Sequence, residues 1–391
     1  MTGRYPLVDP GPELSATQTA RYARHLLLAG FGAPAQRRLA ASRVLVVGAG
    51  GLGSPVLTYL AAAGVGTIGV VDDDLVDASN LQRQTVHTVD DIGRPKTDSA
   101  RESIARINPL VSVETYPFRL VADNAVDLIG RFDLVVDGAD NFPTRYLVSD
   151  ACRLTGRPHV WGSVLGFDGQ VSAFWSDPPP ELGPGVTLRD VFPTPPPAGA
   201  VPSCAVAGVL GVVCGSVGSA MATEAVKLIT GVGTPALGRV LVLDALAGQW
   251  REVPVAPDPT AGPVDTFGDL DGCTVPPTGP QLGARAAVTA PELSELLAGG
   301  TGIDLVDVRE TGEHALVAIP GSRLIPLAAL LDGSAVGALR DDVPVILYCR
   351  SGQRSAQALS AVHARGRTDV RHLDGGVLAW IDQIDQTLPR Y

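Results

Sequence analysis

Cys349 stands at the start of a short loop whose residue types suit the binding of an anion. The loop reads Cys349-Arg350-Ser351-Gly352-Gln353-Arg354, directly after the apolar strand Val345–Tyr348 and before a segment with helical spacing. Backbone N–H groups in such a loop point inward and stabilise negative charge above the cysteine. We expect Arg350 and Arg354 to add positive charge and to keep the Cys349 thiol ionised.

Two kinds of chemistry fit a cysteine in such a loop, a phosphate ester and a persulfide. Phosphatases that form phosphocysteine place their arginine one residue farther from the cysteine than Arg354 stands from Cys349. The smaller loop suits a single terminal sulfur better than a phosphate group, so the sequence predicts that Cys349 carries a persulfide. The alternative, an inert buried cysteine, is disfavoured by the two neighbouring arginines.

A second candidate site begins with the glycine-rich segment Gly48-Ala49-Gly50-Gly51-Leu52-Gly53. It lies between a predicted strand and a predicted helix, where glycines allow a tight turn and helix N-terminal N–H groups meet phosphate oxygens. Asp72 follows Gly53 by 19 residues, at the end of the next strand, where a carboxylate can bind ribose hydroxyls. These features predict a nucleotide site and by themselves fit NAD and ATP equally.

Charged residues beyond this segment favour a triphosphate over a dinucleotide. Attack at the α-phosphorus of a triphosphate requires cations on its phosphates and a metal ion, whereas a dinucleotide needs little further positive charge. Arg83, in the polar run Ser79–Gln84, and Lys96 are candidate cations. Asp140, after the strand Asp133–Val136, is a candidate magnesium ligand. Taken singly, Arg83 or Asp140 would be interpreted as a solvated surface charge.

Lys96 also stands out because lysine is scarce in this chain. It is one of two lysines, although lysine and arginine together number 30. This scarcity favours a functional role for Lys96. Lys227, the other lysine, follows Glu224 on a predicted helix and is interpreted as a surface residue whose ammonium group reaches solvent.

The elements that must position these residues alternate between strand and helix. The strand Val44–Val47, a helix through Ala63 and the strand Thr67–Val71 form a predicted βαβ unit. Two short helices are expected in residues 17–41, and the later elements are the helix Thr97–Ile107, the strand Val111–Tyr116, the helix Ala122–Ile129, the strand Asp133–Val136, the helix Pro143–Thr155 and a hairpin turning at Gly166–Gly169. This alternation predicts an α/β fold with a Rossmann-like doubly wound sheet.

Two proline-rich segments divide the remaining sequence. Asp177–Pro202 is predicted to be an extended loop, and Pro254–Gly283 an interdomain linker. Beyond the linker, a helix at Pro291–Ala298, strands at Ile303–Val308 and Val345–Tyr348, and helical spacing at residues 354–364 and 376–384 predict a smaller α/β domain. We place the first domain at residues 1–255, the linker at 256–284 and the second domain at 285–391.

Composition excludes several classes of protein. The 391 residues are 45% hydrophobic, so the chain can bury large cores, and the net charge of −11 argues against a nucleic-acid binder. Five cysteines without a CxxC pair exclude a disulfide framework, with Cys214 expected in the core and Cys273 without a partner.

The N-terminus lacks a signal pattern. Ala205–Thr223 is long enough to span a membrane, but its glycines and serines favour a buried helix, so we expect a cytoplasmic protein.

Residues 15–255 resemble the ThiF/MoeB family of bacterial ubiquitin-activating-type adenylyltransferases. The segments that carry the resemblance are Arg21-Tyr22-Ala23-Arg24, Gly48–Gly53, Ser79–Gln84, Gly93-Arg94-Pro95-Lys96, Asp137–Asn141 and Pro202–Val209. The resemblance implies that ATP adenylates the C-terminal glycine of a ubiquitin-like sulfur carrier protein ending in Gly-Gly. The ATP-binding residues that it implies are Gly48, Gly50, Gly51, Gly53, Asp72, Asp74, Asn80, Arg83, Gln84, Lys96 and Asp140, with Asp140 also holding Mg²⁺.

The same resemblance implies further roles. Arg24 would reach as a catalytic residue into the ATP site of a partner subunit, which implies a homodimer. Cys204 precedes the apolar helix, whose dipole favours a thiolate at the N-terminus. It would either bind the carrier covalently or be a buried structural cysteine. Many relatives bind zinc through two CxxC pairs; because Thr187–Asp190 and Gly262–Asp265 stand at those positions here, we predict no zinc site.

Residues 285–391 resemble the rhodaneses. The shared segments are Asp307-Val308-Arg309-Glu310, Ile319-Pro320-Gly321-Ser322, the Cys349 loop and Leu373-Asp374-Gly375-Gly376, in family order. The resemblance implies that Cys349 takes a persulfide from thiosulfate or a cysteine desulfurase, while Asp307 and Arg309 stabilise the fold. The whole chain resembles the MoeZ-type adenylyltransferase/sulfurtransferases. The Cys349 persulfide would attack the acyl-adenylate, directly or after an acyl intermediate on Cys204, and reduction would release a thiocarboxylate.

Other functions stay open at this stage. An NAD-dependent oxidoreductase with a rhodanese appendage would leave Arg83, Lys96 and Asp140 without a role. A non-catalytic scaffold would bind the carrier without activating it. An adenylating dehydratase acting on RNA is disfavoured by the acidic balance. For a sulfur carrier, the molybdopterin, thiamine, cysteine and secondary-metabolite pathways are all compatible with the sequence.

Overall fold

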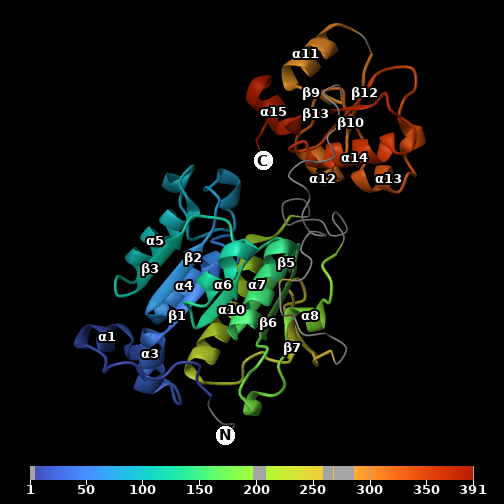
Figure 1. The fold of residues 1–391 in the computed structure, drawn as a ribbon. Helices are drawn as coiled ribbons and strands as arrows, with labels where there is room; N and C mark the ends of the chain where they lie inside the picture. Colours follow the sequence, from blue (N-terminus) through green and yellow to red (C-terminus); the bar gives the residue numbers. More distant parts are fainter. Residues whose placement is uncertain (1–4, 197–207, 259–266, 268–285, 301, 391) are drawn as a thin grey trace. The chain divides into compact units, whose positions relative to one another are not determined.

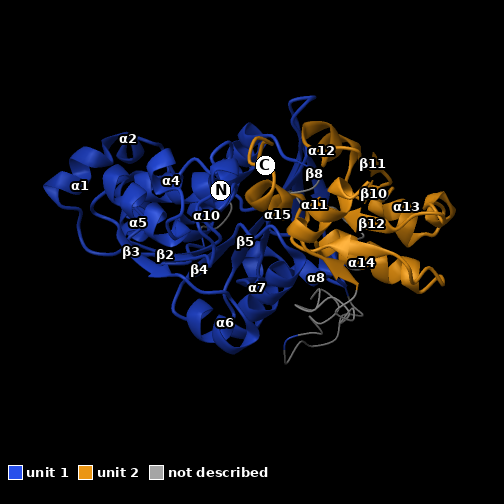
Figure 2. Ribbon diagram, turned by 90° about the horizontal axis from the view of Figure 1, so that it is seen from above, with its two compact units in different colours: residues 1–274 blue, residues 275–391 orange. Residues whose placement is uncertain are grey.

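The computed structural model describes residues 5–196, 208–258, 267, 286–300 and 302–390. They fall into two compact units, residues 1–274 and 275–391, which Figure 2 draws in two colours. Each unit contains its own sheet and is described by itself. Cys204, Cys273 and nearly all of the predicted linker lie outside the described residues, and the domain limits at 255 and 285 stay predictions.

Unit 1 is built on an eight-stranded sheet whose strands follow the order β3-β2-β1-β4-β5-β6-β7-β8. The strands are β1 (Arg43–Val47), β2 (Thr67–Val71), β3 (Ser112–Tyr116), β4 (Leu134–Asp137), β5 (His159–Leu165), β6 (Asp168–Phe174), β7 (Arg239–Asp244) and β8 (Gln249–Pro254). The helices are α1 (Ala16–Arg21), α2 (Ala23–Leu26), α3 (Gly32–Ala41), α4 (Gly53–Ala63), α5 (Lys96–Ile107), α6 (Ala122–Ile129), α7 (Phe142–Thr155), α8 (Leu188–Val191) and α10 (Gly211–Thr230).

The first five strands of this order are parallel, and β6, β7 and β8 are antiparallel. The central strand β1 pairs Val44 with Ile68 of β2 and with Leu134 of β4. Its run of valine and leucine is buried, as expected of a strand covered on both faces. Helices α4, α5 and α10 pack on one face and α6 and α7 on the other (Figure 1). The predicted doubly wound α/β sheet is confirmed.

The N-terminal segment differs from the prediction of two helices in residues 17–41. It forms three helices, because the chain leaves helical geometry at Tyr22, where φ is −98° and ψ 14°. The ring of Tyr22 is buried against Gly64, and its hydroxyl accepts a hydrogen bond from Asn108 Nδ2 over 2.9 Å. Anchoring this ring in the core separates α1 from α2.

Helix α10 begins and ends later than the predicted apolar helix. By length and composition it is long enough to cross a membrane, yet 56% of its most apolar window is buried, against α4, β5 and β6. The interpretation as a buried helix is therefore confirmed. The side chain of Lys227 is 25% exposed, and its Nζ lies 2.6 Å from Oε1 of the buried Glu224, so this lysine also forms an ion pair that the sequence analysis did not expect. Glu224 Oε2 also accepts a hydrogen bond from Ala236 N over 2.7 Å.

Unit 2 contains a five-stranded parallel sheet in the order β11-β10-β12-β13-β9. Its strands are β9 (Ala287–Val288), β10 (Asp304–Asp307), β11 (Arg323–Leu324), β12 (Val345–Tyr348) and β13 (Arg371–Leu373). Its helices are α11 (Ala290–Ala298), α12 (Thr311–Leu316), α13 (Leu327–Leu331), α14 (Gln353–His363) and α15 (Gly376–Gln383). Helices α13 and α14 cover one face, and α11 and α15 cover the other.

Candidate functional site

A pocket of unit 1 opens at the carboxyl ends of β1 and β4, where the strand order of the sheet reverses. Ligands of open α/β sheets bind at such a switch point. The pocket encloses about 1180 Å³, its open mouth included. The predicted nucleotide-binding residues that line it are Gly48, Gly50, Gly51, Asp72, Asp74, Arg83, Gln84, Lys96 and Asp140. Five separate segments of the sequence thus meet around one space.

The glycine loop between β1 and α4 lies against the carboxylate of Asp72. Gly48 takes a φ of 86°, and a Cβ on Gly53 would stand 1.9 Å from the carbonyl oxygen of Gly48, so both positions require glycine. The N–H of Ala49 donates to Asp72 Oδ2 over 2.8 Å, and the N–H of Asp74 donates to Oδ1 over 2.9 Å. Burial raises the pKa of Asp72. The carboxylate is therefore fixed at the edge of the loop.

His87, which the sequence analysis did not single out, connects this loop to helix α5. The side chain is buried, with Nε2 2.9 Å from the carbonyl oxygen of Ala49 and Nδ1 2.8 Å from Ser99 Oγ. Because a carbonyl only accepts hydrogen bonds, Nε2 carries the proton in this arrangement. Burial lowers the pKa of His87, so a neutral imidazole ties the glycine loop to the helix that begins with Lys96.

Two predicted phosphate-binding cations stand at this wall of the pocket. The side chain of Lys96 is 6% exposed, and its Nζ lies 2.7 Å from Oδ2 of Asp74, which is 67% exposed. Solvent reaches this carboxylate, so an anionic ligand can compete for the ammonium group. Arg83 is half-buried, and its Nη1 donates to the carbonyl oxygen of Ser79 over 3.1 Å. Gln84 Oε1 is buried without a hydrogen-bond partner among the described residues, which leaves an acceptor for a ligand.

The loop that follows β4 forms the opposite wall. Asp140 is exposed in this loop, whereas Asp137, the last residue of β4, is fully buried. Asp137 Oδ1 accepts from Ala139 N over 3.0 Å, and Oδ2 has no partner in the described part of the chain. Burial raises the pKa of Asp137 to about 6, against the opposing effects of the Ala139 N–H and of the charge on Arg145.

Sequence reasoning missed several further side chains of the pocket, among them Arg145, Cys214, Asp73 and the exposed Arg119. Arg145 stands one helical turn after Asn141, the residue that caps α7, and this spacing was the available signal. Cys214 is buried as expected, but it also forms part of the pocket wall. Asp73 belongs to a run of three aspartates, 72 to 74, that offer carboxylate oxygens within 4.8 Å of one another.

Three predicted residues that the structure describes do not line the pocket. Gly53 shapes the turn, and Asn80 accepts a hydrogen bond from Asp77 N over 3.3 Å in a local cap. Arg24 is exposed on α2. A fourth predicted residue, Cys204, lies outside the described residues, and helix α10 begins at Gly211.

In unit 2, Cys349 is buried directly after β12. The N–H of Gly352 donates to its Sγ over 3.2 Å, and a φ of 92° at Gly352 turns the loop into α14. The N–H groups of Val377 and Leu378, in α15, donate to the carbonyls of Cys349 and Arg350 over 2.8 and 3.1 Å. The loop is thus held between two helices, and the N-terminus of α14 favours an anion at the sulfur.

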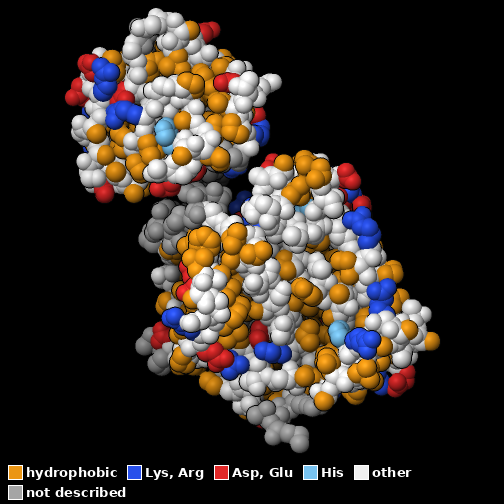
Figure 3. All heavy atoms as spheres, turned by 180° about the vertical axis from the view of Figure 1, so that it is seen from behind, with side chains coloured by type: hydrophobic (Ala, Val, Ile, Leu, Met, Phe, Trp, Pro, Cys, Tyr) orange, Lys and Arg blue, Asp and Glu red, His pale blue; other side chains and the backbone are white. Residues whose placement is uncertain are grey.

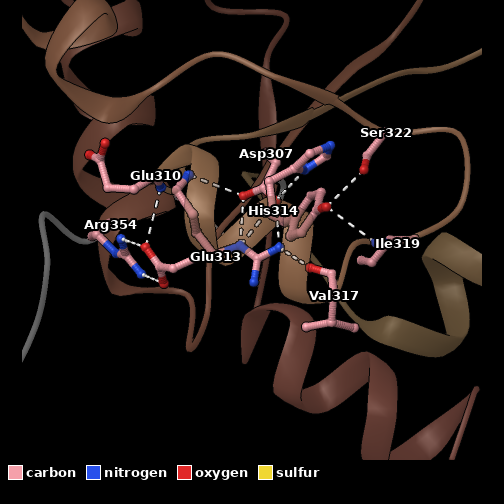
Figure 4. A network of polar contacts seen from close by, with 10 residues as sticks. Asp307, Glu310, Glu313, His314, Val317, Ile319, Ser322 and Arg354 are labelled. Carbon is pink, nitrogen blue, oxygen red and sulfur yellow. Dashed lines mark hydrogen bonds and ion pairs between the residues drawn. The ribbon is translucent and has the colours of Figure 1, made fainter. Parts of the chain in front are cut away.

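Arg354, which we expected to add positive charge at Cys349, is paired with a carboxylate of another element. Its Nη1 and Nη2 donate to the two oxygens of Glu313 over 2.7 and 2.6 Å (Figure 4). The two side chains are 18% and 9% exposed. Glu313 also accepts from the N–H of Glu310 over 3.2 Å. This bidentate pair offsets the charge of Arg354 and joins α14 to α12.

Asp307 and Arg309 form a fully buried ion pair with an N–O distance of 2.5 Å. His314 Nδ1 lies 2.9 Å from Asp307 Oδ2, and Figure 4 shows these side chains together. Although burial alone would raise the pKa of Asp307, hydrogen bonds from Arg309 and His314 lower it. Beside this pair, the hydroxyl of Tyr348 accepts from Ile319 N over 3.2 Å. The network secures the strand that leads into Cys349.

Comparison with known families agrees with the two units. Residues 22–264 match the ThiF family, and residues 289–383 match the rhodanese-like domain. A relative from Mycobacterium tuberculosis, "Probable adenylyltransferase/sulfurtransferase MoeZ", is 49% identical over 99% of this chain and 98% of its own. "Adenylyltransferase and sulfurtransferase MOCS3-1" of Zea mays is 38% identical over 98% of this chain and 85% of its own.

Other relatives and solved structures match part of the chain. The "Sulfur carrier protein adenylyltransferase" of Thermus thermophilus is 51% identical over 61% of this chain and 88% of its own. The structure of the microcin C7 biosynthetic enzyme MccB covers 65% of this chain and 77% of its own, with a TM-score of 0.55 and 19% identity. The structure of PaaA covers 63% of this chain and 76% of its own, with a TM-score of 0.53 and 23% identity. These two likenesses concern the fold.

Proposed function

Because this chain belongs to the ThiF family and also carries a rhodanese-like domain, we propose that it converts the C-terminus of a sulfur carrier into a thiocarboxylate. The chain is an adenylyltransferase and sulfurtransferase, and its family uses ATP. The proposed substrate is a ubiquitin-like carrier protein ending in Gly-Gly. The sulfur donor is thiosulfate or a cysteine desulfurase, the active form is a homodimer, and the location is the cytoplasm.

The first proposed reaction takes place in the pocket of unit 1. A carboxylate oxygen of the carrier bonds to the α-phosphorus of ATP, the bond to the β-phosphate oxygen breaks, and pyrophosphate leaves. The N–H groups of the glycine loop and the cations of Arg83 and Lys96 bind the phosphates, while Asp72 binds the ribose hydroxyls. Gly48, Gly50, Gly51 and Gly53 allow the close approach of the phosphates.

Mg²⁺ fits the oxygen ligands at this pocket. Asp140 is the proposed ligand, and the neighbouring run of three aspartates adds carboxylates of the kind that Mg²⁺ prefers. The ion, when bound, neutralises charge on the phosphates. The proposal includes no zinc, because residues 187–190 and 262–265 contain no cysteine.

The second proposed reaction uses Cys349. Its persulfide sulfur attacks the carbonyl carbon of the acyl-adenylate and AMP leaves, which gives an acyl disulfide. A second thiol then reduces the disulfide bond and releases the thiocarboxylate. The buried loop and the Gly352 N–H at the sulfur support this role. In a variant of the route, Cys204 first accepts the acyl group, and Arg24 contributes to the partner subunit's ATP site.

The convergence of Arg83, Lys96, Asp72 and Asp140 on one pocket at the switch point carries this proposal. The test incubates the protein with ATP, Mg²⁺, thiosulfate, a thiol and a panel of Gly-Gly-ended carriers, then weighs each carrier by mass spectrometry. We expect a carrier whose mass shows one oxygen replaced by sulfur. Cys349→Ala should abolish this product and leave carrier-dependent pyrophosphate exchange intact.

Two results would contradict the proposal. Undiminished thiocarboxylate formation from thiosulfate by Cys349→Ala would remove the persulfide role. Tight binding of NAD, with no pyrophosphate exchange for any carrier, would replace the adenylyltransferase by an oxidoreductase.

A further inference from the structure

Arg145 is a buried cation in the wall of the nucleotide pocket. It lies in the first turn of α7, is 7% exposed, and lines the pocket together with Ala139 and Asp140. Its Nε donates to the carbonyl oxygen of Ala139 over 3.0 Å. Its guanidinium carbon stands 5.5 Å from the ring centre of Phe142 and 5.9 Å from that of Trp161. One hydrogen bond and two rings therefore fix this side chain.

Arg145 makes no close ion pair among the described residues, although its charge acts at longer range on the buried carboxyl of Asp137. No carboxylate of that part of the chain lies within 4.0 Å of its nitrogens, whereas Arg189, Arg309 and Arg354, also well buried, each have one. Its two terminal nitrogens likewise have no hydrogen-bond partner there. Burying a guanidinium whose terminal nitrogens have no hydrogen-bond partner is costly, so these nitrogens are suited to an anion that enters the pocket.

Two kinds of anion would meet in this pocket, the phosphates of ATP and the carboxylate that attacks them. The proposed phosphate-binding groups come from the other wall, where the glycine loop, Arg83 and Lys96 follow β1 and β2. Arg145 instead follows β4. The attacking carboxylate approaches a highly charged triphosphate, so it needs a cation of its own to offset the repulsion. The paired terminal nitrogens of a guanidinium match the two oxygens of a carboxylate.

We propose that Arg145 binds the terminal carboxylate of the carrier and orients it toward the α-phosphorus of ATP. This inference rests on the proposed adenylation. In the reaction one carboxylate oxygen bonds to the phosphorus and pyrophosphate leaves, while the other oxygen keeps its hydrogen bond to the guanidinium. Arg145 is thus a residue that binds the carrier, and the binding of ATP does not depend on it.

The test compares two forms of one carrier that supports pyrophosphate exchange, one with its natural C-terminal carboxylate and one with a carboxamide. Their affinities are measured by titration against the full chain in the presence of a non-hydrolysable ATP analogue. The unaltered protein should bind the carboxylate form more tightly, by about 10- to 150-fold, as expected for charge-assisted hydrogen bonds. Arg145→Gln should bind both forms alike, and its kcat/KM for exchange should fall by about the same factor.

Two more variants guard against a folding defect. Arg145→Lys keeps the positive charge but loses the paired N–H donors of the guanidinium. It should therefore retain part of the preference for the carboxylate form of the carrier. Arg153→Gln, at the far end of the same helix, should behave as the unaltered protein. The affinity for the ATP analogue should be the same in all four proteins, which reports an intact nucleotide site.

The inference would be overturned if Arg145→Gln still bound the carboxylate form of the carrier more tightly than the carboxamide form. It would also be overturned if Arg145→Gln lost as much affinity for the ATP analogue as for the carrier, because Arg145 would then bind a phosphate. If the unaltered protein catalyses no pyrophosphate exchange with any carrier, the proposed function itself is contradicted. If exchange occurs and Arg145→Gln does not impair it, only the role of Arg145 is contradicted.

Discussion

At the scale of single residues, the two lysines of the chain lie in opposite situations. Lys96, itself buried, pairs with the exposed Asp74 at a pocket wall, whereas Lys227, which is 25% exposed, pairs with the buried Glu224. An ion pair with an exposed partner contributes little to stability, while removal of one partner of a buried pair leaves an uncompensated charge. Lys96 is therefore available for a ligand, and Lys227 is a structural residue.

Lys96→Gln is expected to weaken ATP binding by about 10- to 150-fold, because a charge-assisted contact to a phosphate is lost. Its thermal stability should stay unchanged. Lys227→Met is the matched control: it should bind ATP normally but lose about 1–3 kcal/mol of unfolding free energy, because Glu224 loses its cation. Calorimetric titration and denaturant unfolding measure the two effects. Equal ATP affinity in the two variants would contradict the role of Lys96.

Asp137 makes the stability of unit 1 depend on pH. Its pKa of about 6 in the folded chain lies above the ordinary value of an aspartate, so the folded state binds the proton more tightly than the unfolded state. The favourable contribution is complete below the unfolded pKa and is lost as the pH rises through about 4 to 6. Asp137→Asn should abolish this part of the pH dependence and raise the unfolding free energy at pH 7.

Denaturant unfolding at several pH values, followed by tryptophan fluorescence, tests this expectation. Asp127→Asn, an exposed position on α6, is the control that should leave the pH dependence as it is. An Asp137→Asn protein with the slope of the unaltered chain between pH 4 and 6 would show that Asp137 does not titrate there.

At the scale of elements, each candidate site lies where a buried strand ends and a helix begins. The pocket follows β1, β2 and β4, and the Cys349 loop follows β12. Contacts between side chains of different elements then fix the position of the loop. In unit 2 the ion pair of Glu313 with Arg354 connects α12 to the first turn of α14, directly after the loop. The orientation of the loop therefore depends on a helix remote from it in sequence.

Glu313→Gln should loosen the Cys349 loop, because the bidentate pair becomes a neutral contact and about 1–3 kcal/mol of local stability is lost. We expect faster alkylation of Cys349 by iodoacetamide and slower sulfur transfer from thiosulfate. Glu292→Gln, in the exposed cap of α11, serves as the control. Alkylation at the rate of the unaltered protein would show that the pair does not hold the loop.

Sequence patterns predicted most elements, and their failures have a local cause. Apolar β-branched runs such as Val345–Tyr348 identified the buried strands, and β12 has the predicted limits. Strands β7 and β8 were not predicted; β8 has no buried face, because all its residues are exposed, whereas β7 has an apolar run that the sequence analysis left unassigned. The two-residue strands β9 and β11 are too short to carry a pattern.

At the scale of the whole molecule, two units with separate cores carry the two sites. Each unit has its own sheet with helices on both faces, so neither site depends on the core of the other. Where Figure 3 shows the described residues, Lys and Arg side chains lie scattered among Asp and Glu and form no continuous basic surface on the drawn face. This distribution agrees with the net charge of −11.

The amino-acid sequence alone determined the two families, the glycine loop, the Cys349 loop and the order of the elements, because these depend on residues close together along the chain. The tertiary structure decided which charges are paired. It joined Arg354 to Glu313 and Lys227 to Glu224, and among the described residues it left the terminal nitrogens of Arg145 without a hydrogen bond or a close ion pair. Electrostatic partners are set by distance and burial in the folded chain, which spacing along the sequence does not specify.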